Sequence, residues 1–119
     1  MTNNKLIHHF LEGSAKRFPD KIALVHEEVR ATYQQINSQA NHLARFFIEQ
    51  GIIPGDRVVL LLENSLEYVV SYYATLKAGA VAVPMNTELK PDGLLPLLQE
   101  LDAKCLVSVR KFERVLRKV

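Results

Sequence analysis

The sequence predicts an α/β fold, because strand-like apolar runs alternate with helix-patterned segments from residue 57 onward. Three runs, near residues 57–62, 80–84 and 105–109, are short and continuously apolar, as strands covered on both faces are. The helical segments between them supply crossovers that join parallel strands. We therefore predict a partial, three-layer parallel sheet with helices on its faces, within a single module spanning residues 1–119.

A helix and a β-hairpin are expected before this sheet. Residues 5–18 carry apolar side chains at roughly helical spacing, and Pro19-Asp20 then ends the pattern. In the segment that follows, Ile22 and Leu24 are predicted to face one way, with Glu27-Glu28 as the turn and residues 29–31 as the return strand.

The next helix is predicted over residues 33–50. Thr32 and Gln35 make a capping-box pattern at its start, and Gly51 stands where a left-handed residue ends a helix. Its apolar stripe consists of Ile36, Ala40, Leu43, Ala44 and Phe47. Further helices are expected from Asn64 or Ser65 to Lys77–Gly79, over Leu94–Leu101 with Pro91-Asp92 as its beginning, and over Lys111–Val119.

The net charge of +2 comes from the tail, where residues 110–119 hold five basic residues and one acidic residue. The predicted tail helix is amphipathic, with Phe112, Val115, Leu116 and Val119 on its apolar side. Residues 110–118 could contact an anionic membrane or RNA. We favour a helix that covers the sheet and keeps its charges in water, so no nucleic-acid partner is expected.

Composition limits the cellular setting. Cys105 is the only cysteine, which rules out an internal disulfide and fits a reducing, cytoplasmic compartment. The first residues lack the pattern of a signal peptide, and no apolar stretch is long enough to span a membrane.

The stretch LKAGAVAVP, residues 76–84, places a glycine beside a strand and raises the question of a phosphate cradle. Such a cradle needs the order strand, glycine-rich loop, helix, because only that order aims free N–H groups at the anion. Here the chain passes from helix to strand, so Gly79 is predicted to end a helix, with Lys77 in its last turn. Neither GxGxxG nor GxxxxGK[ST] occurs.

Other reactive side chains do not form a recognisable constellation. The adjacent His8 and His9 point about 100° apart on a helix and cannot easily share a metal. Cys105 lies inside a strand and is expected to be inert. Glu63 and Glu67 fit a solvated helix start better than an acid–base pair. We predict no catalytic, cofactor-binding or metal-binding residue in this chain.

Five ordered motifs resemble the N-terminal end of the adenylate-forming enzymes, the AMP-dependent synthetases and ligases. They are Phe18–Lys21 with Ile22–Leu24; Thr32-Tyr33 with Ile36; Gly51 with Pro54–Val58; Asn64-Ser65 with Glu67; and Leu76–Ala80 with Val83-Pro84. Ala31 and Gln35-Ile36 depart from the usual L-T-Y-x-E-L. This family includes acyl-CoA synthetases, firefly luciferase and the adenylation domains of peptide synthetases. Residues 86–91 look more like acyl- or aryl-CoA synthetases, which implies fatty acid metabolism.

The resemblance implies a parent enzyme that uses ATP, Mg²⁺ and CoA or a carrier-protein thiol to activate a carboxylic acid through an acyl-adenylate. The family's phosphate loop, ribose-binding aspartate and catalytic lysine have no counterpart here. We therefore expect a scaffold segment of a longer chain, inactive alone, which binds the remainder of the parent enzyme or self-associates through uncovered apolar surface. The alternative is a stand-alone binding or assembly module that acts through a partner chain.

Overall fold

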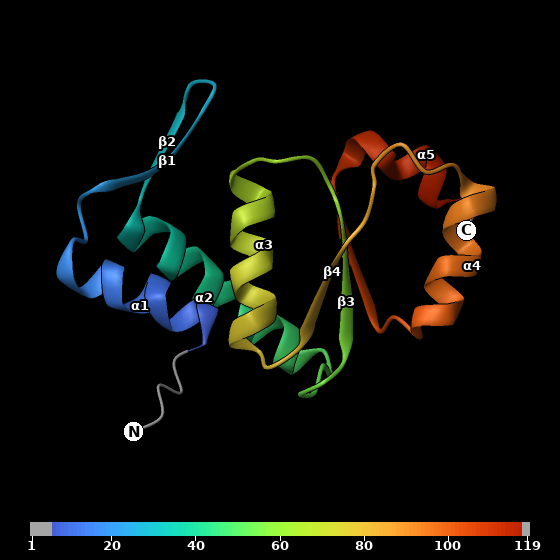
Figure 1. Ribbon diagram of the computed structural model, residues 1–119, viewed down its shortest axis with the longest axis horizontal. Coiled ribbons are helices and arrows are strands. Elements are labelled where there is room, and N and C mark those ends of the chain that lie inside the picture. The colour runs from blue at the N-terminus through green and yellow to red at the C-terminus, as the bar shows by residue number, and fades with distance from the viewer. Residues whose placement is uncertain (1–5, 118–119) are drawn as a thin grey trace.

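A three-stranded parallel sheet lies at the centre of the computed structural model, which describes residues 6–117 (Figure 1). Its strands are β3 (Arg57–Leu61), β4 (Val81–Pro84) and β5 (Cys105–Ser108), in the order β4-β3-β5. In the register, Val59 of β3 stands opposite Val83 of β4 and Leu106 of β5. The predicted α/β fold with three parallel strands is confirmed.

Helices cover both faces of the sheet, as predicted. The chain runs from β3 to β4 through α3 (Leu66–Lys77), then back past β3 to β5 through α4 (Pro91–Leu101). Because the direction of travel reverses, right-handed crossovers place the two helices on opposite faces. Figure 1 shows α3 on one side of the strands and α4 on the other.

The first part of the chain packs beside α3. It comprises α1 (Ile7–Arg17), a hairpin of β1 (Ile22–His26) and β2 (Val29–Thr32), and α2 (Tyr33–Glu49). The capping box is present: the Thr32 hydroxyl accepts from the Gln35 N–H at 3.1 Å, and the Thr32 N–H donates to Gln35 Oε1 at 2.8 Å. Two of the four free amides at the start of α2 thereby gain hydrogen-bond acceptors, and the capping-box pattern in the sequence predicted both bonds.

The hairpin differs from the predicted alternation. The register shifts between Ile22 and Leu24, so Ala23 and Leu24 both pack against the small core of Leu11, Ala31 and Ile36, while Ile22 is exposed. This β-bulge inserts one residue and changes which side chains face inward, which periodicity alone does not reveal. The predicted turn at Glu27-Glu28 is confirmed, and Glu27 takes a positive φ of 55°.

The main core lies between the sheet and the helices α2 and α3. Val58, Leu60 and Leu62 point to this face and are fully or almost fully buried. The helix residues packed with them are Ala40, Ala44, Phe47, Ala74 and Ala78. Small alanines bring the helix backbones close to the strands, so the large strand side chains fill the space between them.

The C-terminal part agrees with the sequence prediction in one feature and differs in another. Helix α4 begins at Pro91, where Pro91-Asp92 was predicted to begin it, and Pro96 lies within it. Beyond β5, a short 3₁₀ helix, η1 (Arg110–Phe112), leads into the four-residue α5 (Glu113–Leu116). The predicted helix over 111–119 is therefore too long within the described residues, and Val119 lies outside them. Phe112 is buried, as its apolar position predicted.

Candidate functional site

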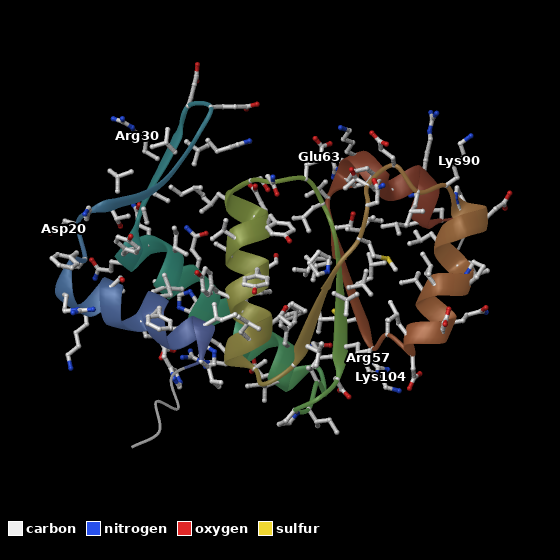
Figure 2. The ribbon with its side chains drawn as sticks, in the orientation of Figure 1. Asp20, Arg30, Arg57, Glu63, Lys90 and Lys104 are labelled. Carbon is white, nitrogen blue, oxygen red and sulfur yellow. The ribbon has the colours of Figure 1, made fainter. Side chains whose placement is uncertain are left out.

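The carboxyl edge of the parallel sheet is the place where α/β folds bind ligands, in the crevice where neighbouring strands lead to opposite faces. Here β3 leads into α3 on one face, whereas β5 leads into η1 and α5 on the other. The turn at residues 62–65 and the segment at residues 109–111 therefore meet at this crevice. Figure 2 shows Glu63 at this edge, and Arg57 and Lys104 at the opposite edge.

Two hollows open at this edge. One holds about 480 Å³ and lies between the β3–α3 turn and the end of β4. Its lining consists of Leu62, Glu63, Asn64, Tyr68, Pro84, Met85, Asn86 and Thr87. The other, about 330 Å³, lies between the same turn and the hairpin tip at His26 and Glu27. Both are shallow and open, so each needs a further wall to enclose a ligand.

Three polar side chains at the crevice, those of Glu63, Ser65 and Lys111, already have partners. Lys111 Nζ lies 2.5 Å from a carboxylate oxygen of Glu63, and this hydrogen bond, with the lysine charge, lowers the pKa of Glu63. Glu63 is thus held as an anion, which suits it poorly to donate a proton. The hydroxyl of Ser65 accepts from the Tyr68 N–H at 3.1 Å, so it caps α3. The arrangement joins two turns but presents no activated nucleophile.

Gly79 lies away from this crevice and has the structural role that the sequence predicted. It follows the end of α3 with φ 78°, and its amide donates to the Leu76 carbonyl. A glycine fits here because other residues rarely adopt this conformation. Lys77 lies in the last turn of α3, as predicted, and its side chain is only 6% exposed and binds Glu12 at 2.5 Å. The sequence carries no signal for this pair, since 65 residues separate its members.

The histidines and the cysteine do not come together as a site. His8 and His9 lie side by side on α1, with ring centroids 4.4 Å apart, and burial lowers the pKa of His8 below its ordinary value. Within residues 6–117, no three His, Cys, Asp or Glu side chains form a group that could hold a metal ion. Cys105 is half-buried, and that burial raises the pKa of its thiol, which keeps it protonated.

Within the described part of the chain, no helix is long and apolar enough to cross a bilayer. This finding agrees with the sequence, which contains no long apolar stretch.

The comparison with protein families decides the identity. The model of the AMP-binding enzyme family matches residues 11–119, almost the whole chain. The chain belongs to the AMP-binding enzyme family. The resemblance based on the five motifs is thereby confirmed.

Relatives within this family are much longer than the chain. Tyrocidine synthase 1 of Brevibacillus parabrevis is 35% identical over 115 residues, which are 97% of this chain and 11% of that protein. Among solved structures, the N-terminal domain of FACL13 from Mycobacterium tuberculosis has a TM-score of 0.89 and 36% identity, covering 95% of this chain and 29% of that one. A Mycobacterium tuberculosis fatty acyl CoA synthetase gives 0.87 and 35%, covering 93% and 22%.

These similarities place the chain in the family without separating its branches. A peptide synthetase and a fatty acyl CoA synthetase match this chain at the same identity, 35%. The branch therefore has to be argued from particular residues.

Proposed function

We propose that the chain is the N-terminal scaffold segment of an ATP-dependent ligase that joins a carboxylic acid to a thiol through an acyl-adenylate. The family match over residues 11–119 supports this proposal. The observation that carries it is the chemistry of the carboxyl edge, where Glu63 is paired with Lys111 and Ser65 caps α3. Such an edge can hold loops in place, but it supplies no acid, base or nucleophile.

The described residues do not fit ATP or Mg²⁺ by themselves. Mg²⁺ is usually held by one or two carboxylates together with phosphate oxygens and water, and among residues 6–117 no three His, Cys, Asp or Glu side chains form a group that could hold a metal ion by themselves. A helix start after a strand can bind a phosphate through its free amides, and one of the amides in the first turn of α3, that of Tyr68, already donates to the Ser65 hydroxyl. ATP, Mg²⁺ and CoA or a carrier thiol are therefore proposed as ligands of the whole enzyme, bound by its other segments.

The loop after β4 supports an acyl or aryl acid as the substrate of this enzyme. Its sequence, residues 86–91, resembles acyl- and aryl-CoA synthetases, and Asn86 Oδ1 accepts from the Glu88 N–H at 2.8 Å to form a tight turn. A fatty acid is thus a candidate substrate. A cytoplasmic location fits the single half-buried thiol of Cys105.

A chimaera tests the scaffold role. The matched 22% of the Mycobacterium tuberculosis fatty acyl CoA synthetase is replaced by this chain, and ATP–pyrophosphate exchange is measured with fatty acids. Because the segment positions and does not react, we expect the chimaera to keep exchange activity, while the 119-residue chain alone shows none. A folded chimaera without exchange, or turnover by the isolated chain that Glu63→Gln abolishes, would contradict the proposal.

The uncovered edge of β5 also supports a second candidate, a stand-alone module that binds a partner chain. Two results for the 119-residue chain would favour that alternative: a monodisperse monomer in analytical ultracentrifugation and a cooperative thermal transition in calorimetry. An independent domain needs no other part of a longer enzyme for its stability.

A further inference from the structure

We infer that helix α1 is a pH-sensitive element: protonation of His8 releases this helix from the end of α3, while the parallel sheet and its main core stay folded. The inference goes beyond the proposed scaffold role and does not depend on it. Three observations support it: the few buried side chains that hold α1, the ionisable groups that meet where α1 touches α3, and a buried ring nitrogen of His8 without a partner.

Helix α1 is attached to the rest of the fold by few buried side chains. Leu11 and Ala15 are the buried residues among the eleven that form this helix. Leu11 belongs to the small core with Ala31 and Ile36, which is separate from the main core between the sheet and the helices α2 and α3. Segments with few buried apolar contacts open at a lower free energy than the whole protein unfolds. We therefore expect α1 to open without unfolding the main core.

Ionisable side chains meet where the start of α1 lies beside the end of α3 (Figure 1). His8 and Glu12 stand four residues apart on α1 and therefore share one side of the helix. Glu12 binds Lys77 of α3 at 2.5 Å, and the Lys77 side chain is only 6% exposed. The ring of His9 lies beside that of His8, with the two centroids 4.4 Å apart. A charge on His8 thus lies near two other basic groups, and the nearby carboxylate is already bound to Lys77.

The other helix packed against α1 does not compensate for this charge. Helix α2 contacts α1, but its charged or readily protonated side chains are exposed and are not among the groups that act on His8: His42, Arg45 and Glu49. On α3, burial raises the pKa of the Tyr73 hydroxyl further above its ordinary value, so this side chain stays neutral near pH 7.

The His8 ring is poorly placed to carry a second N–H. Its Nδ1 atom is buried and has no hydrogen-bond partner. Both ring nitrogens bear hydrogen in the protonated form, so Nδ1 would become a buried donor without an acceptor, which costs free energy. The hollow of about 220 Å³ beside His8 offers no polar side chain, since its other lining residues are Leu6, Ile7, Leu76, Gly79 and Ala80.

These surroundings set the direction of the pH effect. Burial, followed by the charge of His9, lowers the pKa of His8, and Lys77 adds to this against the opposing effect of Glu12. Release of α1 brings His8 into water and returns its pKa toward the ordinary value of 6.5. The released form therefore takes up a proton at higher pH than the docked form. Docking is at full strength above pH 6.5 and weakens as the pH falls toward the lowered pKa.

The test is amide hydrogen exchange of the 119-residue chain, followed by NMR, with each rate corrected for the intrinsic effect of pH. We expect the α1 amides of Leu11 and Ala15 to be at least about tenfold less protected than those of Leu60 and Ala74 in the main core, because α1 opens by itself. Low concentrations of urea should leave the α1 rates unchanged, since a local opening exposes little surface. The readout needs no catalysis, so it is independent of the proposed function.

Acid should lower the protection of the α1 amides. Between about pH 7.5 and about pH 5.5 we expect a fall of about threefold, and uptake of one proton allows at most about tenfold. His8→Gln, whose side chain stays neutral, should remove most of this fall. His9→Gln is the matched control and should keep it: His9 is exposed, and its Nδ1 accepts from the Leu6 N–H at 3.1 Å, a bond that a glutamine oxygen can also accept.

Glu12→Gln tests the ion pair that holds α1 to α3. This variant leaves the largely buried Lys77 charge without its carboxylate and removes the group that favours a charge on His8. The α1 amides should therefore exchange about threefold faster or more at both pH values. Unchanged exchange in Glu12→Gln would contradict the role of this pair in docking α1.

Three further results would overturn the inference. The first is α1 protection equal to that of the main core, which would mean that α1 opens only when the whole protein unfolds. The second is a fall in acid that His9→Gln removes and His8→Gln leaves, which would assign the effect to the bond at Leu6. The third is the same α1 protection at both pH values.

Discussion

On one face of the sheet, Leu60 and its neighbours pack against the alanine-rich sides of α2 and α3. On the other face, toward which Val59 and Leu61 point, α4 and η1 supply Leu94 and Phe112 as buried side chains among the described residues, while Leu95 and Leu97 remain exposed. The same strand is thus buried by two long helices on one side and by a thin layer on the other. Burial of a strand on both faces therefore does not mean that both faces are packed equally well.

Matched leucine substitutions should expose this difference most strongly. Leu60 and Leu94 are both 0% exposed. We expect Leu60→Ala to lower the free energy of unfolding by about 3–4 kcal/mol and Leu94→Ala by about 2 kcal/mol, because a thin layer can collapse around a cavity. Urea denaturation followed by circular dichroism measures both. Equal losses would mean that the two faces are packed alike.

Ion pairs offer a second comparison. On the well-packed side, Glu12→Gln leaves the largely buried Lys77 charge without its partner and should cost about 1–2 kcal/mol of unfolding free energy. The pair of Arg117 and Glu113 on α5 is exposed, so Glu113→Gln should cost less than about 0.5 kcal/mol. Urea titrations of the two variants check this order, and a larger loss for Glu113→Gln would reverse it.

The ends of α3 and α4 provide a third comparison. After α3 the chain turns at Gly79 with φ 78°, whereas after α4 it turns at Asp102, a residue with a side chain held at φ 51°. Gly79→Ala should cost about 1 kcal/mol, and its new Cβ would lie 3.4 Å from Pro54. Asp102→Gly should instead stabilise the fold by about 0.5 kcal/mol. Thermal midpoints of both variants test these opposite signs.

The smallest expected effect is a dependence of stability on pH, and it comes from His8 of α1, which lies on the same side of the sheet as α2 and α3. Burial, helped by the neighbouring His9 and Lys77 charges and opposed by Glu12, lowers the pKa of His8 below its ordinary value of 6.5. The unfolded chain then takes up a proton at higher pH than the folded one, so stability is complete above 6.5 and declines as pH falls toward the lowered pKa. Urea midpoints at about pH 7.5 and about pH 5.5 should show this decline.

His8→Gln should reduce that pH dependence. The pKa of Glu12 is also lowered, by the hydrogen bond from Lys77, so its contribution is lost only at pH values below its ordinary 4.5. If the urea midpoint of His8→Gln still differs between the two pH values as much as that of the unmodified chain, another group causes the pH dependence.

The sequence predicted those parts of the fold that depend on local chemistry. The capping residues Thr32 and Gln35, the helix end at Gly79 and the apolar strand at residues 57–62 all signal their conformation through neighbours in the chain. The bulge between Ile22 and Leu24 was missed because it changes the register of two strands without changing their composition. The Glu12–Lys77 pair was missed because only the packing of α1 on α3 brings it together.

The candidate site followed a similar division. The direction of the chain through Gly79 was enough to argue against a phosphate cradle there. The hydrogen bond between Glu63 and Lys111 could not be predicted without knowing the strand order β4-β3-β5. This order brings together, across one crevice, two residues that are 48 positions apart in the sequence. Short apolar strands carry little information about their lateral order, since the same sequence suits any central position.

Pro84 has a consequence for how this protein can assemble. Fibres that grow by strand addition need two receptive edges on every molecule, so that each copy can bind one above and one below. With proline on the β4 side, the three-stranded sheet has one receptive edge within the described residues, at β5. Two copies can therefore join through their β5 strands, but that contact uses up the receptive edge of both. We therefore expect edge-to-edge association of this three-stranded sheet to end at a pair instead of propagating into a filament.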